Sequence, residues 1–220
     1  MVAMTKAEAI SRIQQGLGWR DDKDTEITLE LRLVQDLLEK GQSLPPWLLA
    51  GTGYLTGTAN QEYIALPTGF IRFDEDLEFS TTDSDGVLQP VTQVDYRELL
   101  QLGQDPVDGS TETGRVKWVA LRWSRLYVRP VPTSSFTITC DWYAADEDIG
   151  GLASSGTNNW LTYGHDILLG KAGQRMAQDL HNDKAERNFT ELYQTGQARL
   201  LTEIAMRKQN ARRYRVGARR

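Results

Sequence analysis

The feature that most constrains the fold is an alternating run, WVALRWSRLYVRPVPTSSFTITCDWY, over residues 118–143. Period-two alternation rich in aromatic and β-branched residues is typical of strands with one buried face. Pro130 and Pro132 cannot donate ladder hydrogen bonds, so the pattern predicts a hairpin of residues 126–129 and 136–143 with its turn near residues 131–134. A lone hairpin is marginally stable in water, and this one requires further strands or a helix to cover its apolar face.

The same alternation predicts which side chains lie on each face of the hairpin. Arg122, Arg125, Tyr127 and Arg129 are expected on the exposed face, which we interpret as a protein-contact surface. Cys140 is the only cysteine and falls on the other face, so we expect a buried, inert thiol with a raised pKa. The complete set expected to be buried is Val119, Leu121, Trp123, Leu126, Val128, Phe136, Ile138, Cys140 and Trp142.

Two amphipathic helices are predicted before residue 42. Thr5 and Glu8 have the spacing of a capping box, which starts a first helix that ends at residues 16–18. A second helix is expected to begin at Asp24 or Thr25 and to end at Gly41. Its apolar stripe consists of Ile27, Leu31, Val34 and Leu38, widened by Leu33 and Leu37.

Two further helices are predicted near the C-terminus. Asn158 or Asn159 would cap one over residues 160–180, and Asn182 or Asp183 would cap the last one. Small residues in the first of these helices would allow another helix to approach closely, namely Gly164, Gly170, Gly173 and Ala177.

Between these pairs of helices the pattern is that of short strands and turns. Residues 61–143 predict about four or five strands, enough for an antiparallel sheet. Gly51, Gly53 and Gly57 indicate turns, residues 83–86 another turn, and a short helix capped by Thr92 or Asp95 precedes Gly103. Residues 144–159 are expected to be a mobile crossing loop.

Together these patterns predict an α+β fold. A helical bundle would be formed by residues 1–42 and 159–206, with an antiparallel β segment inserted over residues 43–158. Residues 207–220 would form an extended basic C-terminal arm, and the part of it after Lys208 is expected to be unfolded in the free monomer.

Charge is distributed unevenly along the chain. The net charge is -5, and the arm holds seven basic residues and no acid, so residues 1–206 carry -12. A solubilising end would account for such an arm, but interleaved aromatic and apolar residues favour docking to an acidic partner. The docking residues would be Arg207, Lys208, Arg212, Arg213, Tyr214, Arg215, Val216, Arg219 and Arg220.

Membrane and secretory classes are not favoured by the composition. The mean hydropathy is -0.48, and no apolar run is long enough for a transmembrane helix. The N-terminal residues lack the apolar stretch of a secretory signal, which favours a product made and used in a cytoplasm.

No motif in the sequence points to catalysis, a metal or a cofactor. Gly51, Gly53 and Gly57 lack the strand and helix context of a phosphate loop. His165 and His181 lie too far apart to share a metal, and a buried Cys140 would be a poor nucleophile. The acidic runs at residues 74–76 and 146–148 do not follow the calcium-loop pattern and are interpreted as solvated charge. We therefore expect no enzyme, metal or cofactor.

Several short motifs follow one another in a recognisable order. Two N-terminal helices lead to YIALPTGF at residues 63–70, followed by VLQPV at residues 87–91 and YRELL at residues 96–100. LYVRPVP at residues 126–132 and DWY at residues 141–143 come next, before the two closing helices. This order resembles the head-to-tail adaptor (connector) proteins of tailed bacteriophages, in which similar motifs form a step into a strand, the piece that follows it and a hairpin.

The resemblance implies a structural protein of the virion. Such adaptors form a ring, in the family a dodecamer, that binds beneath the portal protein and offers a platform to tail or nozzle proteins. Genome DNA would pass through the ring channel without sequence recognition, and assembly would occur in the host cytoplasm without a membrane partner. The expected site is the head-to-tail junction, with the arm ordering on the portal.

One rival class remains open from the sequence alone. A small nucleic-acid-binding protein could use the same basic arm, and if its seven basic residues neutralised duplex phosphates, log K against log salt would slope at about -6. Salt-titrated DNA binding separates this class from an adaptor.

Overall fold

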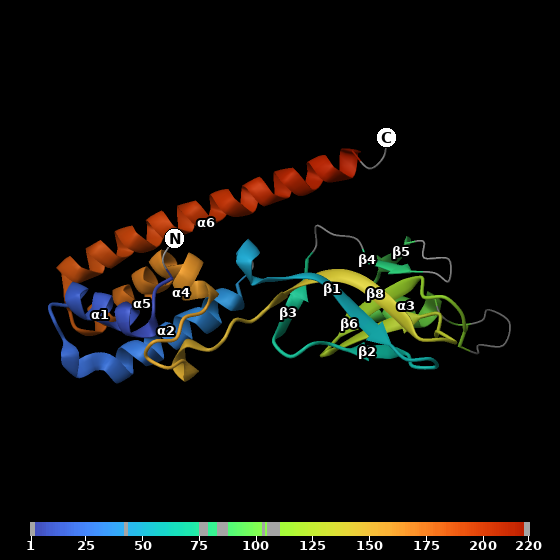
Figure 1. Cartoon of the computed structure of the whole chain (residues 1–220), viewed down its shortest axis with the longest axis horizontal. Helices are drawn as coiled ribbons and strands as arrows, with labels where there is room; N and C mark the ends of the chain where they lie inside the picture. Colours follow the sequence, from blue (N-terminus) through green and yellow to red (C-terminus); the bar gives the residue numbers. More distant parts are fainter. Residues whose placement is uncertain are drawn as a thin grey trace. The chain divides into compact units, whose positions relative to one another are not determined.

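The computed structural model describes residues 3–41, 44–74, 79–82, 88–102, 104 and 111–217. The chain divides into two compact units. Unit 1 comprises Met1–Leu48 and Ala145–Arg220, and unit 2 comprises Leu49–Ala144 (Figure 1). The predicted turn at residues 83–86 and the cap residue Gly103 lie outside the described residues.

Unit 1 is helical. Its elements are α1 (Lys6–Gly16), η1 (Asp21–Lys23), α2 (Asp24–Glu39), η2 (Pro46–Leu48), η3 (Ile149–Gly151), α4 (Asn159–Tyr163), α5 (His165–Asp179) and α6 (Asp183–Gly217). α5 packs against α1, α2 and α6, so the prediction that the N- and C-terminal helices pack together is confirmed. Arg175 of α5 adds an ion pair to Glu30 of α2, with 2.6 Å between Nε and Oε2.

The helix caps show how local sequence sets the helix boundaries. Thr5 and Glu8 form the predicted capping box at the start of α1. Asn158 accepts from the backbone N–H of Leu161 at the start of α4, and Asn182 accepts from Ala185 at the start of α6. The predicted cap of α2 is wrong, because Lys23 occupies the cap position and makes no side-chain hydrogen bond there.

Two predicted features of the helices need correction. The helix expected over residues 160–180 is broken at Gly164, which ends α4 and precedes α5. Leu33 and Leu37 do not widen the buried stripe of α2, because they are 42% and 53% exposed. Ile27, Leu31 and Val34 form the buried stripe as predicted.

Glycines set the distance between α5 and α6. A Cβ at Gly170 would lie 2.5 Å from the backbone N of Tyr193, and a Cβ at Gly173 would lie 2.4 Å from the ring of Phe189. Real Cβ atoms do not come so close to other heavy atoms, so only glycine permits this packing. The prediction that these two glycines allow close helix approach is confirmed.

The C-terminal arm is helical where the structure describes it. α6 spans 35 residues and continues to Gly217, so the prediction of an unfolded tail after Lys208 is wrong for residues 209–217. The arm lacks an apolar period, but its Arg, Lys, Gln and Ala residues have high helix propensity and extend a helix that is already nucleated. Figure 1 shows this red end of α6 extending past the other helices of unit 1.

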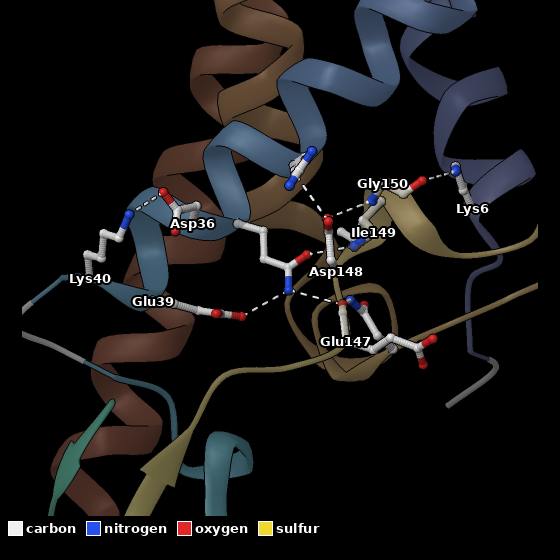
Figure 2. Close-up of polar contacts among 11 residues, drawn as sticks. Lys6, Asp36, Glu39, Lys40, Glu147, Asp148, Ile149 and Gly150 are labelled. Atoms are coloured by element: carbon white, nitrogen blue, oxygen red, sulfur yellow. Dashed lines mark hydrogen bonds and ion pairs between the residues drawn. The ribbon is translucent and has the colours of Figure 1, made fainter. Parts of the chain in front are cut away.

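Residues 145–158, expected to form a mobile loop, are held on α1 and α2 by polar contacts (Figure 2). The amide of Gln35 donates to the carbonyl of Glu147 and accepts from the N–H of Ile149. Lys6 donates to the carbonyls of Gly150 and Leu152. Because a buried backbone group must find a partner, these side chains replace the ladder that a strand would supply.

Unit 2 is a mixed sheet with one helix. It contains β1 (Leu49–Gly57), β2 (Tyr63–Ala65), β3 (Phe70–Phe73), β4 (Phe79–Thr82), β5 (Leu88–Gln93), α3 (Tyr96–Leu102), β6 (Trp118–Arg122), β7 (Arg125–Arg129) and β8 (Phe136–Ala144). The strand order is β1-β8-β4-β5-β6-β7-β2, with β3 also paired to β8. β1 and β2, at the two ends of this order, contact each other, so the sheet is nearly closed.

The sequence predicted an antiparallel sheet, but the sheet in the structure is mixed. β5 and β6 pair in parallel, with Thr92 opposite Trp118. Parallel neighbours require a crossover, and residues 94–117, which include α3, supply it. Asp95 caps α3 as predicted, because its Oδ1 accepts from the N–H groups of Arg97 and Glu98.

The predicted hairpin of residues 118–143 is wrong in its pairing. β7 pairs with β6 through a tight turn at Trp123 and Ser124, whereas β8 pairs with β1, β3 and β4. The alternation identified the strands but could not identify their partners, because pairing depends on residues distant in the sequence. The buried register is confirmed for Leu126, Val128 and Ile138, but Leu121 and Trp123 are exposed.

The glycines expected to form turns lie within strand β1. A Cβ at Gly53 would fall 1.7 Å from the ring of Trp142, and one at Gly57 would fall 2.2 Å from the ring of Phe136. The aromatic side chains of β8 therefore lie across β1 where it has no side chain. The core beneath consists of Leu55, Ile64, Phe73, Phe79, Val91, Val116, Val119, Leu126, Val128, Ile138 and Cys140.

Candidate protein-contact surfaces

Unit 2 displays a continuous group of stacked arginine and aromatic side chains, which we call the Arg–aromatic array. The guanidinium of Arg122 lies 4.3 Å from the ring centroid of Tyr96 and 4.4 Å from that of Trp123. Arg125 lies 4.2 Å from the ring of Tyr63. Tyr127 joins the two halves, at 4.9 Å from Tyr96 and 5.8 Å from Tyr63.

The fold brings the members of this array together from separate elements. Arg122 and Arg125 face each other directly across the β6–β7 pair, and Tyr63 of β2 faces Tyr127 of β7. Two like charges in directly opposed positions repel each other. Here each guanidinium stacks on the electron-rich face of an aromatic ring, and this attraction offsets the repulsion. Tyr96 comes from α3, so sequence alternation within the hairpin could not reveal it.

Trp123 is the most exposed aromatic member of the array. It is 79% exposed and has a φ of 53°. The left-handed region is unfavourable for a bulky L residue and costs about 1–3 kcal/mol. The tight turn between β6 and β7 imposes this backbone and directs the indole ring outward.

Arg129 does not belong to this exposed surface, contrary to the prediction. Its side chain is 7% exposed and pairs with Glu62, with 3.0 Å between Nη2 and Oε2. A buried arginine needs a carboxylate partner, and Glu62, whose side chain is 49% exposed, supplies it at the edge of the interior of unit 2. Of the predicted face, Arg122, Arg125 and Tyr127 are therefore brought together and Arg129 is not.

Unit 1 carries a second surface, which we call the acidic groove. It has a volume of about 440 Å³ and is lined by apolar Leu29 and Leu33 and by the acids Asp36, Glu39, Asp146 and Asp148. Leu29, Leu33 and Leu37 recur every fourth residue along one exposed face of α2. The sequence pattern assigned Leu33 and Leu37 to the buried stripe and did not identify Leu29.

The polar side chains of the groove are fixed by hydrogen bonds. Glu39 is 8% exposed, and its Oε1 accepts from Trp160 Nε1 at 2.8 Å, from Gln35 and from the N–H of Asp146. Asp148 pairs with Arg32 at 3.0 Å. The amide of Gln35 donates to Glu39 and to the carbonyl of Glu147 and so bridges α2 and residues 145–158. Figure 2 shows Glu39, Glu147 and Asp148 in this region. The groove is thus rigid and negatively charged.

The predicted basic arm forms the last part of α6. Arg207 is half-buried, the backbone is helical to Gly217, and Arg219 and Arg220 lie outside the described residues. Its role as a docking segment stays a prediction.

The candidate catalytic and metal residues are not brought together. Among the described residues, no group of three potential metal ligands comes close enough to hold an ion. Cys140 is buried, and this desolvation, followed by the nearby Asp141 charge, raises its pKa to about 12. The prediction of a buried thiol with a raised pKa is therefore confirmed, and its inertness stays a prediction.

The acidic run at residues 146–148 is not simply solvated charge. Asp146 accepts from the N–H of Trp160 in the first turn of α4, where the positive end of the helix favours a carboxylate. Within the described ranges, no helix is long and apolar enough to cross a membrane.

Exposed arginine, tryptophan and leucine side chains on rigid supports are typical of proteins that act by binding other proteins. Comparison with models of protein families shows which group of such binding proteins the chain belongs to. The model of the family described as SU10 adaptor protein matches residues 4–220, and the chain belongs to this family. No curated protein matches the chain. The resemblance to phage head-to-tail adaptors is confirmed at the level of the family, a structural phage family that is not known as an enzyme.

Proposed function

We propose that the protein forms a ring beneath the portal of a tailed phage and provides the attachment platform for tail components. Membership in the SU10 adaptor family implies a head-to-tail adaptor role and supports this proposal. The ring would be a dodecamer at the head-to-tail junction of the virion, assembled in the host cytoplasm, and genome DNA would pass through its channel without sequence recognition.

The observation that carries the portal contact is the length of α6. Its 35 residues correspond to about 52 Å of helix. Among the side chains that the structure describes on α6, which end at residue 209, the last buried apolar one is Leu200, whereas Leu201 and Met206 are exposed and Arg207 is half-buried. The remaining helix to Gly217 thus extends beyond the packed part of unit 1 and forms an arm suited to binding outside the molecule.

The charge of the arm is compatible with its helical form. The arm contains no acid, and cations are favourable near a helix C-terminus because the last carbonyls carry partial negative charge. A preformed helical arm loses less conformational entropy on docking than an unfolded one. We infer that it binds an acidic groove on the portal protein.

The proposal is tested by neutralising the arm without shortening it. Replacing Arg207, Lys208, Arg212, Arg213 and Arg215 by Gln keeps high helix propensity while removing five charges. We expect the variant to lose co-sedimentation with the cognate portal ring while its unfolding transition stays unchanged.

A matched control uses the beginning of the same helix. Lys184→Gln and Arg187→Gln remove charges from α6 far from the arm and should leave portal binding intact. Portal binding by the arm-neutralised variant at the wild-type level would contradict the arm contact.

The alternative of a small nucleic-acid-binding protein is supported by the same basic arm. It predicts DNA binding whose log K falls with log salt at a slope of about -6 and is lost in the arm-neutralised variant. An adaptor would show weak, sequence-independent DNA binding and strong portal binding. Measuring DNA binding and portal binding of the wild type and of the arm-neutralised variant separates the two functions.

A further inference from the structure

We propose that the Arg–aromatic array of one copy docks into the acidic groove of a neighbouring copy. Trp123 would sit on Leu29 and Leu33, and Arg122 and Arg125 would face the carboxylates of the groove. The inference rests on the proposed function, because it assigns the contact through which copies would join in a ring.

Trp123 has the properties of an anchor residue. It is 79% exposed, and its φ of 53° is unfavourable for a bulky side chain. Tryptophan is among the residues whose truncation weakens protein interfaces most. An indole held outward on a strained turn gains most when a partner buries it, and this points to a concave apolar site as its counterpart.

The two arginines beside Trp123 are held in position before any partner binds. Arg122 lies between the rings of Tyr96 and Trp123, and Arg125 lies over the ring of Tyr63. Stacking fixes the plane of a guanidinium but leaves its N–H edge available for carboxylates. Because these side chains are already ordered, they lose little freedom on binding an acidic surface.

The acidic groove of unit 1 complements this array in shape and apolar character. Leu29 and Leu33 are 52% and 42% exposed, and the volume of about 440 Å³ is large enough for an indole ring. Leu37, one turn further along α2, is also exposed and extends the apolar surface.

The charges of the groove also complement the array. Its lining has four acids, of which Asp148 pairs with Arg32 and Asp36 pairs with Lys40, while Glu39 and Asp146 remain without a basic partner among the described residues. Within the described part of the chain, Glu39 and Asp146 accept hydrogen bonds from neutral donors and have no cation within ion-pair distance. Two incoming guanidinium groups would balance this negative charge.

The occupant that fits best is a second copy of this chain. The array and the groove are different surfaces, so each copy that donates an array keeps its own groove free for the next copy. Such a contact is heterologous and closes into a ring when the rotation between copies permits it. A two-fold dimer would instead pair one surface with itself.

Complementary variants test this pairing by sedimentation velocity over a series of concentrations. Trp123→Ala disables the array and Leu33→Asp disables the groove, and each variant alone should self-associate about 30-fold more weakly than the wild type. An equimolar mixture should form a one-to-one pair that does not grow further, because each partner keeps one intact surface. Arg122→Gln with Arg125→Gln should act in the same direction as Trp123→Ala.

Matched controls remove exposed apolar side chains elsewhere. Tyr54→Ala, at a 67% exposed residue of β1, and Leu201→Asp, at a 56% exposed residue of α6, should leave self-association unchanged. Circular dichroism and thermal unfolding of each variant establish that it is folded.

A cross-linking experiment tests the contact between the array and the groove even if free copies do not associate. Ser124→Cys and Leu33→Cys in one chain, assembled on the portal ring, should give a ladder of disulfide-linked multimers, because Cys140 is buried. Ser124→Cys with Lys184→Cys should give none.

The outcomes separate this inference from the proposed function. If the ring assembles on the portal but the cysteine pair gives no ladder or links within one copy, the inference is overturned and the ring function stands. The inference is also overturned, and the ring function stands, if Trp123→Ala weakens DNA binding and leaves assembly unchanged. If the wild type forms no ring and binds no portal, the proposed function fails as well.

Discussion

In unit 1, the ring of Phe189 on α6 lies against Gly173 of α5, and in unit 2, the ring of Trp142 on β8 lies against Gly53 of β1. In both units an aromatic side chain thus occupies the space next to a glycine, which has no side chain, on the facing element. The two cases differ in what limits the approach. On α5, the neighbouring Gly170 also meets the backbone of Tyr193, whereas the contact at Gly53 involves only ring atoms of Trp142.

This difference shows what each glycine contributes. The spacing of α5 and α6 has no hydrogen-bond ladder to fix it, so the side chains at the crossing set the distance between the helix axes. The spacing of β1 and β8 is fixed by backbone hydrogen bonds, and Gly53 makes room for one half-buried ring. Substitutions at the two positions should therefore differ in cost and in how they can be rescued.

The largest effect is expected at Gly170. Gly170→Ala places a Cβ 2.5 Å from the Tyr193 backbone N, which can move only if the helices separate. We expect the free energy of unfolding to fall by about 3 kcal/mol, measured by urea titration. Gly151→Ala is the matched control, because a Cβ there meets nothing within 4 Å. A loss at Gly170 no greater than at Gly151 would show that glycine does not set the helix spacing.

A smaller but still large effect is expected at Glu39, which supports unit 1 by polar contacts. Glu39→Leu removes the acceptor of the Trp160 indole N–H and of the partly buried Asp146 N–H, and one of the two acceptors of the Gln35 amide. We expect a loss of about 2–3 kcal/mol in urea unfolding, since each unsatisfied buried donor is costly. Glu39→Gln keeps an acceptor oxygen and should lose less than half as much, and equal losses would contradict this reading.

At Gly53 the expected cost is lower and can be rescued. Gly53→Ala forces the half-buried ring of Trp142 to rotate, and we expect the free energy of unfolding to fall by about 1–2 kcal/mol. In a Trp142→Leu background the same change should be neutral or slightly stabilising, because alanine loses less backbone entropy than glycine on folding. If a double-mutant cycle showed no coupling between Gly53→Ala and Trp142→Leu, the ring of Trp142 would not be the cause of the loss. The contrast between Gly53 and Gly170 would then not hold.

A modest effect is expected at the capping box of α1. Thr5→Ala removes the hydroxyl that accepts from the N–H of Glu8. We expect about 1 kcal/mol of lost stability in thermal or urea unfolding. Thr28→Ala, on the exposed face of α2, is a control that removes a hydroxyl without removing a cap.

The smallest expected effect is a pH dependence at Glu8. Hydrogen bonds from the Thr5 backbone and side chain lower the pKa of Glu8 below its ordinary 4.5. A lowered carboxyl pKa stabilises the fold above pH 4.5, and this contribution is lost as the pH falls through the folded-state pKa. Glu8→Gln should therefore be less stable than the wild type at pH 7, and the two should converge in acid. A difference that persists at low pH would contradict this linkage.

The sequence predicted what depends on neighbouring residues. Thr5, Asp95 and Asn158 cap helices as expected, because a cap is set within about one turn. The alternation of β8 placed Ile138 and Cys140 inside correctly. Membership in the phage adaptor family was also visible in the order of short motifs.

Features that depend on distant residues were missed. Gly53 and Gly57 suggested turns because their aromatic partners lie on β8, more than 70 residues away. Arg129 alternates with exposed residues, but its side chain is buried and pairs with the partly exposed Glu62, which precedes β2. The Arg–aromatic array required Tyr96, which reaches it only after the crossover through α3. Such contacts follow from topology and cannot be inferred from local pattern.

The continuity of α6 has a mechanical consequence. Between Leu200 and Gly217 the helix spans 17 residues, or about 26 Å, with no proline to act as a joint. A tilt of about 10° where the helix leaves its packing would displace the tip by about 4–5 Å, as for a rigid lever. Movement at the tip would in turn be felt at Gly196, where α6 contacts the backbone of Ile167. A docking event at the arm and the packing of the helical unit are therefore coupled by a stiff rod.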